Sequence, residues 1–184
     1  MKVHLGVDVG SVTTKFAILD QEDHLVTDLY TRTLGRPVQI VQEGLERIAR
    51  QLPAGAEVAS VGVTGSARRL TGIVVGADVV KNEITAHAVA AASLVPDLHT
   101  VLEIGGQDSK LIMLDHGIVT DFAMNSVCAA GTGSFLDQQA YRLNLPVEEI
   151  GPLALHSRQP VRIAGRCTVF AESDMIHKQQ MGHG

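Results

Sequence analysis

Two segments of this chain share one residue pattern, and a constant distance of 95 positions separates them. Residues 7–20 read VDVGSVTTKFAILD, and residues 102–115 read LEIGGQDSKLIMLD. The alignment has no gap and matches an acid, a glycine and a lysine in each copy: Asp8 with Glu103, Gly10 with Gly105, and Lys15 with Lys110. An internal repeat restricts the choice of fold strongly, because both copies are expected to form the same local structure.

The residues around each copy predict two strands joined by a glycine turn. We expect strands at residues 3–9, 13–19, 25–31, 58–63, 100–104, 110–114, 118–123 and 161–163. Apolar residues at helical spacing predict helices at residues 37–52, 84–95, 134–143, 146–155 and 168–180. The expected fold class is α/β, with one lobe at residues 1–96 and a second at 97–184.

The composition supports an aliphatic core and excludes some functions. Apolar residues make up 45% of the 184 residues but aromatic residues only 3%, which is typical of buried strands in α/β folds. The net charge of -5 offers no basic surface for nucleic acid. No apolar stretch is long enough to span a membrane, and Asp8 interrupts any secretory signal, so we expect a cytoplasmic protein.

Glycine turns after a strand can bind phosphate, because glycine lets backbone amides approach an anion closely. The candidate phosphate-binding residues are Gly10, Ser11, Val12, Thr13, Thr14 and Lys15 in the first turn and Gly105, Gly106 and Gln107 in the second. The acids before the turns, Asp8 and Glu103, are candidate ligands for hydrated Mg²⁺. Neither a P-loop nor a Rossmann motif occurs, and ordinary hairpin turns are the alternative.

The paired hairpins resemble the two phosphate motifs of the actin, sugar-kinase and heat-shock-chaperone superfamily. Further segments resemble the ATPase activators of 2-hydroxyacyl-CoA dehydratases and the ATPase subunits of benzoyl-CoA reductases: TGSARR, NEITAHA, NSVCAAGTGSFLDQQAYRL and GRCTVFAESDMI. This resemblance covers essentially the whole chain. It implies two duplicated ribonuclease-H-like lobes, in an actin-like ATPase fold, with ATP in the cleft between them.

The resemblance also implies roles for the candidate residues. Asp8 would position Mg²⁺, Glu103 would be a possible second carboxylate, and Asp108 would orient water or metal. ATP hydrolysis would drive a low-potential one-electron transfer to a dehydratase or reductase partner in anaerobic metabolism. An upstream donor such as ferredoxin or flavodoxin would supply the electron.

Cys128 and Cys167 each lie beside a predicted helix start. An iron–sulfur cluster normally takes four thiolates, which a symmetric homodimer would supply. The resemblance implies that both cysteines bind one [4Fe–4S] cluster per homodimer, with amides of Gly131 and Gly133 close to its sulfides. The alternatives are two inert buried thiols, or a metal site formed by Cys167, His177 and His183.

Two features depart from the family pattern. Glu103 occupies a position where aspartate is common in relatives, and no glycine-rich adenosine motif follows Gly133. We therefore expect the second lobe to be C-terminally incomplete, with weakened nucleotide affinity and an exposed apolar edge that promotes association. A small-molecule kinase of the same superfamily and a non-catalytic fragment that binds a nucleotide or partner are the alternative functions.

Overall fold

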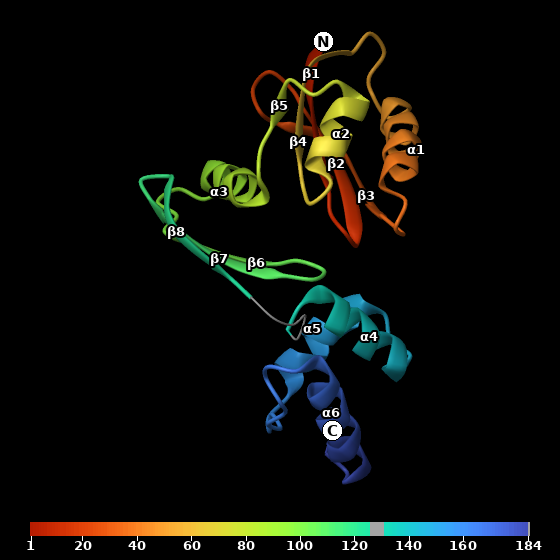
Figure 1. Ribbon diagram of the computed structural model, residues 1–184, viewed down its shortest axis with the longest axis vertical. Coiled ribbons are helices and arrows are strands. Elements are labelled where there is room, and N and C mark those ends of the chain that lie inside the picture. Colours follow the sequence, from red (N-terminus) through yellow and green to blue (C-terminus); the bar gives the residue numbers. More distant parts are fainter. Residues whose placement is uncertain (126–130, 184) are drawn as a thin grey trace. The chain divides into compact units, whose positions relative to one another are not determined.

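The computed structural model describes residues 1–125 and 131–183 (Figure 1). The chain divides into two compact units, Met1–Leu98 with Asp115–Val119, and His99–Leu114 with Thr120–Gly184. Strands and helices occur in both, which confirms the predicted α/β class. The predicted lobes at 1–96 and 97–184 stay a prediction, because compactness alone does not show that a unit folds independently.

The first unit contains a five-stranded mixed sheet of order β3-β2-β1-β4-β5 (Figure 1). Its strands are β1 (Lys2–Val9), β2 (Thr13–Leu19), β3 (Leu25–Arg32), β4 (Glu57–Thr64) and β5 (Val79–Val80). Strands β1, β2 and β3 are antiparallel neighbours, whereas β4 runs parallel to both β1 and β5. The helices are α1 (Pro37–Ala49), α2 (Arg68–Val75) and α3 (Glu83–Leu94).

The core of the first unit lies on one face of this sheet, beneath α1 and α2. Every second residue of β1 is buried, since alternate side chains of a strand point to opposite faces. The buried cluster consists of Val3, Leu5, Val7, Val9, Phe16, Ile18, Leu29, Val41, Ile48 and Val63. The same alternation places Asp8 and Lys15 on the opposite face of the sheet.

Gly44 of α1 lies close to this sheet. A Cβ atom at Gly44 would lie 2.2 Å from two ring atoms of the buried Phe16. We expect Gly44→Ala to lower the free energy of unfolding by about 1–3 kcal/mol, because the ring has no space to move away. Urea unfolding followed by circular dichroism measures this change. Gly151→Ala is the matched control: Gly151 also lies in a helix and has nothing within 4 Å, so alanine should be neutral or stabilising there.

In the second half of the chain, the described residues form a three-stranded sheet and three helices. The strands are β6 (Thr100–Ile104), β7 (Ser109–Asp115) and β8 (Ile118–Met124), in the order β6-β7-β8, with β6 and β7 antiparallel. The helices are α4 (Gly133–Leu143), α5 (Val147–His156) and α6 (Thr168–Gln180).

Two of the predicted elements differ from the structure, and two observed elements, α2 and β5, were not predicted. Helix α1 ends at Ala49, three residues before the predicted end, and residues 161–163 are not a strand. A strand needs a neighbouring strand for its backbone hydrogen bonds, and no described strand pairs with this segment. Helix α2 was not predicted, because RRLTGIVV has weak helix propensity. Packing against β4 and β5 is what supports this helix.

One face of the β6-β7-β8 sheet exposes apolar side chains. Leu102 and Leu111 are register partners on neighbouring strands and therefore share a face. The exposed large apolar residues of the three strands are Leu102, Ile104, Leu111, Met113, Ile118, Phe122 and Met124. The second half of the chain thus exposes apolar surface, and its predicted tendency to associate remains a prediction.

Candidate functional site

The first glycine turn joins β1 to β2 in a tight hairpin. The Gly10 amide donates a hydrogen bond of 2.9 Å to the Thr13 carbonyl, and a Cβ atom at Gly10 would lie only 3.0 Å from that oxygen. Asp8 and Lys15 are register partners on the two strands. Lys15 Nζ contacts Asp8 Oδ2 at 2.9 Å, so the lysine partly neutralises the candidate metal-binding acid.

The second glycine turn joins β6 to β7 with the same hydrogen bonding. The Gly105 amide donates to the Asp108 carbonyl at 2.8 Å, and Glu103 and Lys110 are register partners. Lys110 Nζ contacts Glu103 Oε2 at 3.0 Å. The sequence repeat is therefore one local structure formed twice, as the repeat predicts.

The two hairpins differ in how deeply the lysine is buried. The Lys15 side chain is 39% exposed, whereas the Lys110 side chain is 4% exposed. Lys110 also contacts a second carboxylate, since its Nζ lies 2.7 Å from Asp108 Oδ1. Lys110 thus holds two of the predicted catalytic residues, Glu103 and Asp108, side by side.

This difference in burial predicts different costs for the same substitution. Lys110→Met would leave two carboxylates without their shared cation, and we expect the free energy of unfolding to fall by about 2–3 kcal/mol. Contact of both acids with water keeps this loss below that of a fully buried pair. Lys15→Met, at the equivalent position of the repeat, should cost less than about 1 kcal/mol. Urea unfolding of both variants checks the comparison. Equal losses in the two variants would contradict it.

Each hairpin accepts a hydrogen bond from a threonine that lies later in the chain. Thr33 Oγ1 donates to the Gly10 carbonyl at 2.8 Å, and Thr132 Oγ1 donates to the Gly106 carbonyl at 3.1 Å. Both threonines are buried. These two threonines were not among the predicted site residues, because neither spacing nor motif in the sequence connects them to the turns.

The candidate residues of the first turn differ in what they can offer a ligand. Thr14 is fully buried, and its hydroxyl lies 3.0 Å from that of Thr33. Any contact from Thr14 to phosphate would therefore involve its backbone. Ser11 is exposed, and Val12 and Thr13 are half-buried at the tip of the turn. Their predicted contacts with phosphate remain predictions.

The second hairpin is attached to the start of α4. The amides of Gly133 and Ser134 donate to the carbonyls of Gly105 and Gly106 at 2.9 and 3.0 Å. A Cβ atom at Gly133 would lie 3.3 Å from the Gly105 carbonyl oxygen, so this contact favours glycine. The Gly133 amide is thus engaged within the protein. Gly131 is exposed with a positive φ of 82°.

Cys167 is a free, half-buried thiol at the start of α6. It occupies the N-cap position, where the helix dipole stabilises negative charge. Asp174, within the same helix, accepts a 2.9 Å hydrogen bond from the Ala164 amide and so fixes the segment that precedes the cysteine. Cys128, the other predicted cluster ligand, lies outside the described residues.

The described residues do not favour the alternative metal site at Cys167, His177 and His183. Across residues 1–125 and 131–183, the one group of three potential ligands that lie together is Asp20, Glu22 and His24. This group forms an exposed turn in which amides donate to Asp20. The hydrogen bond from the His24 amide is the main cause that lowers the pKa of the Asp20 carboxyl. The group is therefore explained by turn formation.

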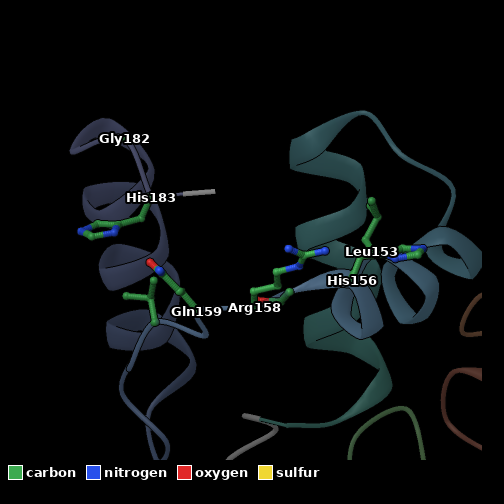
Figure 2. Close-up of a pocket in the computed structure, with 8 residues that line it drawn as sticks. Leu153, His156, Arg158, Gln159, Gly182 and His183 are labelled. Atoms are coloured by element: carbon green, nitrogen blue, oxygen red, sulfur yellow. The ribbon is translucent and has the colours of Figure 1, made fainter.

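An open hollow of about 610 Å³ lies near the end of the described chain (Figure 2). Figure 2 shows His183 and Gln159 on one side of it and His156 and Leu153 on the other. Its lining residues are Leu153, His156, Ser157, Arg158, Gln159, Val161, Gly182 and His183. His183 of the alternative metal site lines this hollow, but none of the candidate nucleotide-binding residues does, so the hollow adds nothing to the candidate nucleotide site.

Comparisons with known proteins show the family and the fold of this chain. The profile of the BadF/BadG/BcrA/BcrD ATPase family matches residues 5–183. The (R)-2-hydroxyglutaryl-CoA dehydratase activating ATPase of Acidaminococcus fermentans is 39% identical over 183 residues, 97% of this chain and 68% of that protein. The 2-hydroxyisocaproyl-CoA dehydratase activator of Clostridioides difficile is 35% identical over 178 residues, 94% of this chain and 64% of that protein.

A solved structure extends this similarity to three dimensions. The 2-hydroxyisocaproyl-CoA dehydratase activator of Clostridium difficile with bound ADPNP superimposes with a TM-score of 0.83 at 31% identity, over 98% of this chain and 67% of that one. The chain thus has the α/β fold of the actin-like ATPases. Within that class it belongs to the BadF/BadG/BcrA/BcrD ATPase family.

Proposed function

We propose that this chain is an ATP-dependent electron donor that activates a dehydratase of the 2-hydroxyacyl-CoA type or a reductase of the benzoyl-CoA type. The observation that supports this most is the repeated hairpin: two glycine turns with the same hydrogen bond and the same acid–lysine pair, in a chain of this ATPase family. The names of the relatives, which are dehydratase activators, supply the class of partner.

The first hairpin suits a magnesium-bound phosphate. The Asp8 carboxylate is partly exposed, so it can reach a hydrated cation while Lys15 remains beside it. When a nucleotide binds, the Lys15 ammonium would be shared between Asp8 and a phosphate oxygen. In the second hairpin the buried Lys110 would keep Glu103 and Asp108 in place, and Asp108 would orient water.

The Cys167 thiol suits a cluster ligand, because it is free, partly accessible and placed at a helix N-terminus. Cys128 and Cys167 from two copies of the chain would supply the four thiolates of one [4Fe–4S] cluster. A cluster held there would supply the one-electron donor. Two apolar side chains shortly after Cys167, those of Val169 and Phe170, are exposed. This exposure supports a second copy docking at this end of α6.

The contacts between the second hairpin and α4 would couple the nucleotide to the cluster. A shift of Gly105 and Gly106 on nucleotide binding or hydrolysis must either move Gly133 and Ser134 or break their hydrogen bonds. Helix α4 follows Cys128 in the sequence, so this movement would reach the cysteine. Such coupling requires that the nucleotide binds the two states with different affinity.

We propose that the protein acts in the cytoplasm and receives its electron from a ferredoxin or flavodoxin. Among the described residues, no helix combines the length and the apolar character that crossing a membrane requires. The exposed carboxylates and the net charge of -5 do not favour nucleic acid as a partner.

Anaerobic reconstitution with iron and sulfide tests this function. The expected result is a brown protein with iron bound at two cysteines per chain, ATP hydrolysis without added acceptor, and ATP-dependent reduction of a partner dehydratase. ATP consumption that requires an added sugar would favour the kinase instead. A protein that binds neither iron nor Mg²⁺-nucleotide would refute the proposal.

A further inference from the structure

A row of three side chains crosses the sheet of the first unit next to the first hairpin. Asp8 on β1 is the register partner of Lys15 on β2 and of Thr64 on β4. Register partners on neighbouring strands point to the same face, so these three side chains lie on one face. This is the face opposite the helix-covered core.

The two carboxylate oxygens of Asp8 point to different neighbours. Oδ2 accepts from Lys15 Nζ at 2.9 Å. Oδ1 lies on the side of β4, because a Cβ atom built at Gly65 would be 2.6 Å from it and 2.4 Å from the Val9 carbonyl oxygen. Gly65 has a positive φ of 97°. It therefore provides space for this oxygen at the point where the chain leaves β4.

The Thr64 hydroxyl lies on this same side and has no hydrogen-bond partner among the described residues, although the atom itself is buried. A buried hydroxyl without a partner is costly to keep in a folded protein. Valine has the same shape and favours strands, so the hydroxyl is not needed for packing. The hydroxyl and Asp8 Oδ1 are thus both on the β4 side of Asp8, whereas Oδ2 contacts Lys15.

On the basis of the proposed nucleotide-binding function, we propose that Thr64 is a further positioning residue of this site. Its hydroxyl, together with Asp8 Oδ1, holds the hydrated Mg²⁺ that accompanies the nucleotide. Mg²⁺ usually keeps several of its waters and takes few protein carboxylates, so a neutral hydroxyl that accepts from a metal-bound water complements one aspartate. Neither Thr64 nor Gly65 was among the site residues predicted from the sequence.

The test compares the full chain with Thr64→Val, which removes the hydroxyl, and with Thr64→Ser, which keeps it. Calorimetric titration with ADP, once with Mg²⁺ and once with a chelator, gives the gain in affinity due to the metal. We expect Thr64→Val to reduce this gain roughly tenfold and Thr64→Ser to change it less than about twofold. Affinity for ADP in the presence of the chelator should be unchanged in both variants.

Thermal unfolding without ligand provides a second readout. Thr64→Val should melt a few degrees higher than the wild type, because it removes an unpaired buried hydroxyl. The inference is overturned if the wild type shows a metal-dependent gain that Thr64→Val retains in full. It is also overturned if Thr64→Val loses ADP affinity equally with and without Mg²⁺. A wild-type chain that binds no ADP in Mg²⁺ would instead overturn the proposed function itself.

Discussion

The Cys167→Ser variant is expected to bind less than about a tenth of the iron that the wild type takes up on anaerobic reconstitution. Serine keeps the size and the N-cap position of this residue at the start of α6 but removes the thiolate that iron requires. Since each chain would contribute only two thiolates, losing one from each copy would leave two of the four ligands. Iron and sulfide analysis, with the absorbance of the cluster in the blue, measures this loss.

The same variant should still bind nucleotide, because Cys167 belongs to neither hairpin. Cys128→Ser should show an equal loss of iron, and gel filtration should show fewer dimers in both variants if the cluster joins the two copies. Full iron content in either variant would rule out a shared cluster. If both variants kept half of the iron content of the wild type, the two cysteines would belong to separate iron sites.

The Asp8→Asn variant is expected to hydrolyse ATP roughly a hundredfold more slowly than the wild type, or slower still. Asparagine preserves the shape of the side chain, but it removes the negative charge that would hold the cation and that Lys15 now neutralises. Lys15 would then lose the carboxylate with which it forms an ion pair. Steady-state phosphate release at saturating Mg²⁺ measures the effect, and nucleotide titration with a chelator shows whether the loss depends on the metal.

Asp28→Asn is the matched control for this substitution. Asp28 is exposed on β3 of the same sheet, opposite Ala17 of β2. The substitution there makes the same chemical change away from the glycine turn and from the Asp8–Lys15 pair. Its rate should stay within about twofold of the wild type, as is usual for surface substitutions away from a site. An Asp8→Asn rate as high as that of Asp28→Asn would show that Asp8 does not bind the metal.

The repeat made the two hairpins predictable from the sequence. Acid, glycine and lysine at equal spacing are local signals, because a strand, a turn and the register of a hairpin depend on residues close together in the chain. The structure accordingly shows Asp8 opposite Lys15 and Glu103 opposite Lys110. The family resemblance was also carried by continuous segments, such as the one around Cys167.

Burial was not predictable from these local signals. The aligned lysines look equivalent in the sequence, yet one is 39% exposed and the other 4%. Thr14 was among the candidate phosphate-binding residues, but strand alternation turns its hydroxyl toward Thr33. Exposure depends on what packs over each residue, and those contacts come from distant parts of the chain.

The sequence by itself determined the local chemistry of this protein: the two glycine hairpins, their acid–lysine pairs and the cysteine at the start of α6. Only the tertiary structure decided which remote residues support them. Thr33 and Thr132 donate hydrogen bonds to the turns. Gly133 hydrogen-bonds the start of α4 to the second hairpin, and Thr64 is the register partner of Asp8. The physical reason is that these contacts depend on strand order and helix packing, which bring together residues that no local pattern relates.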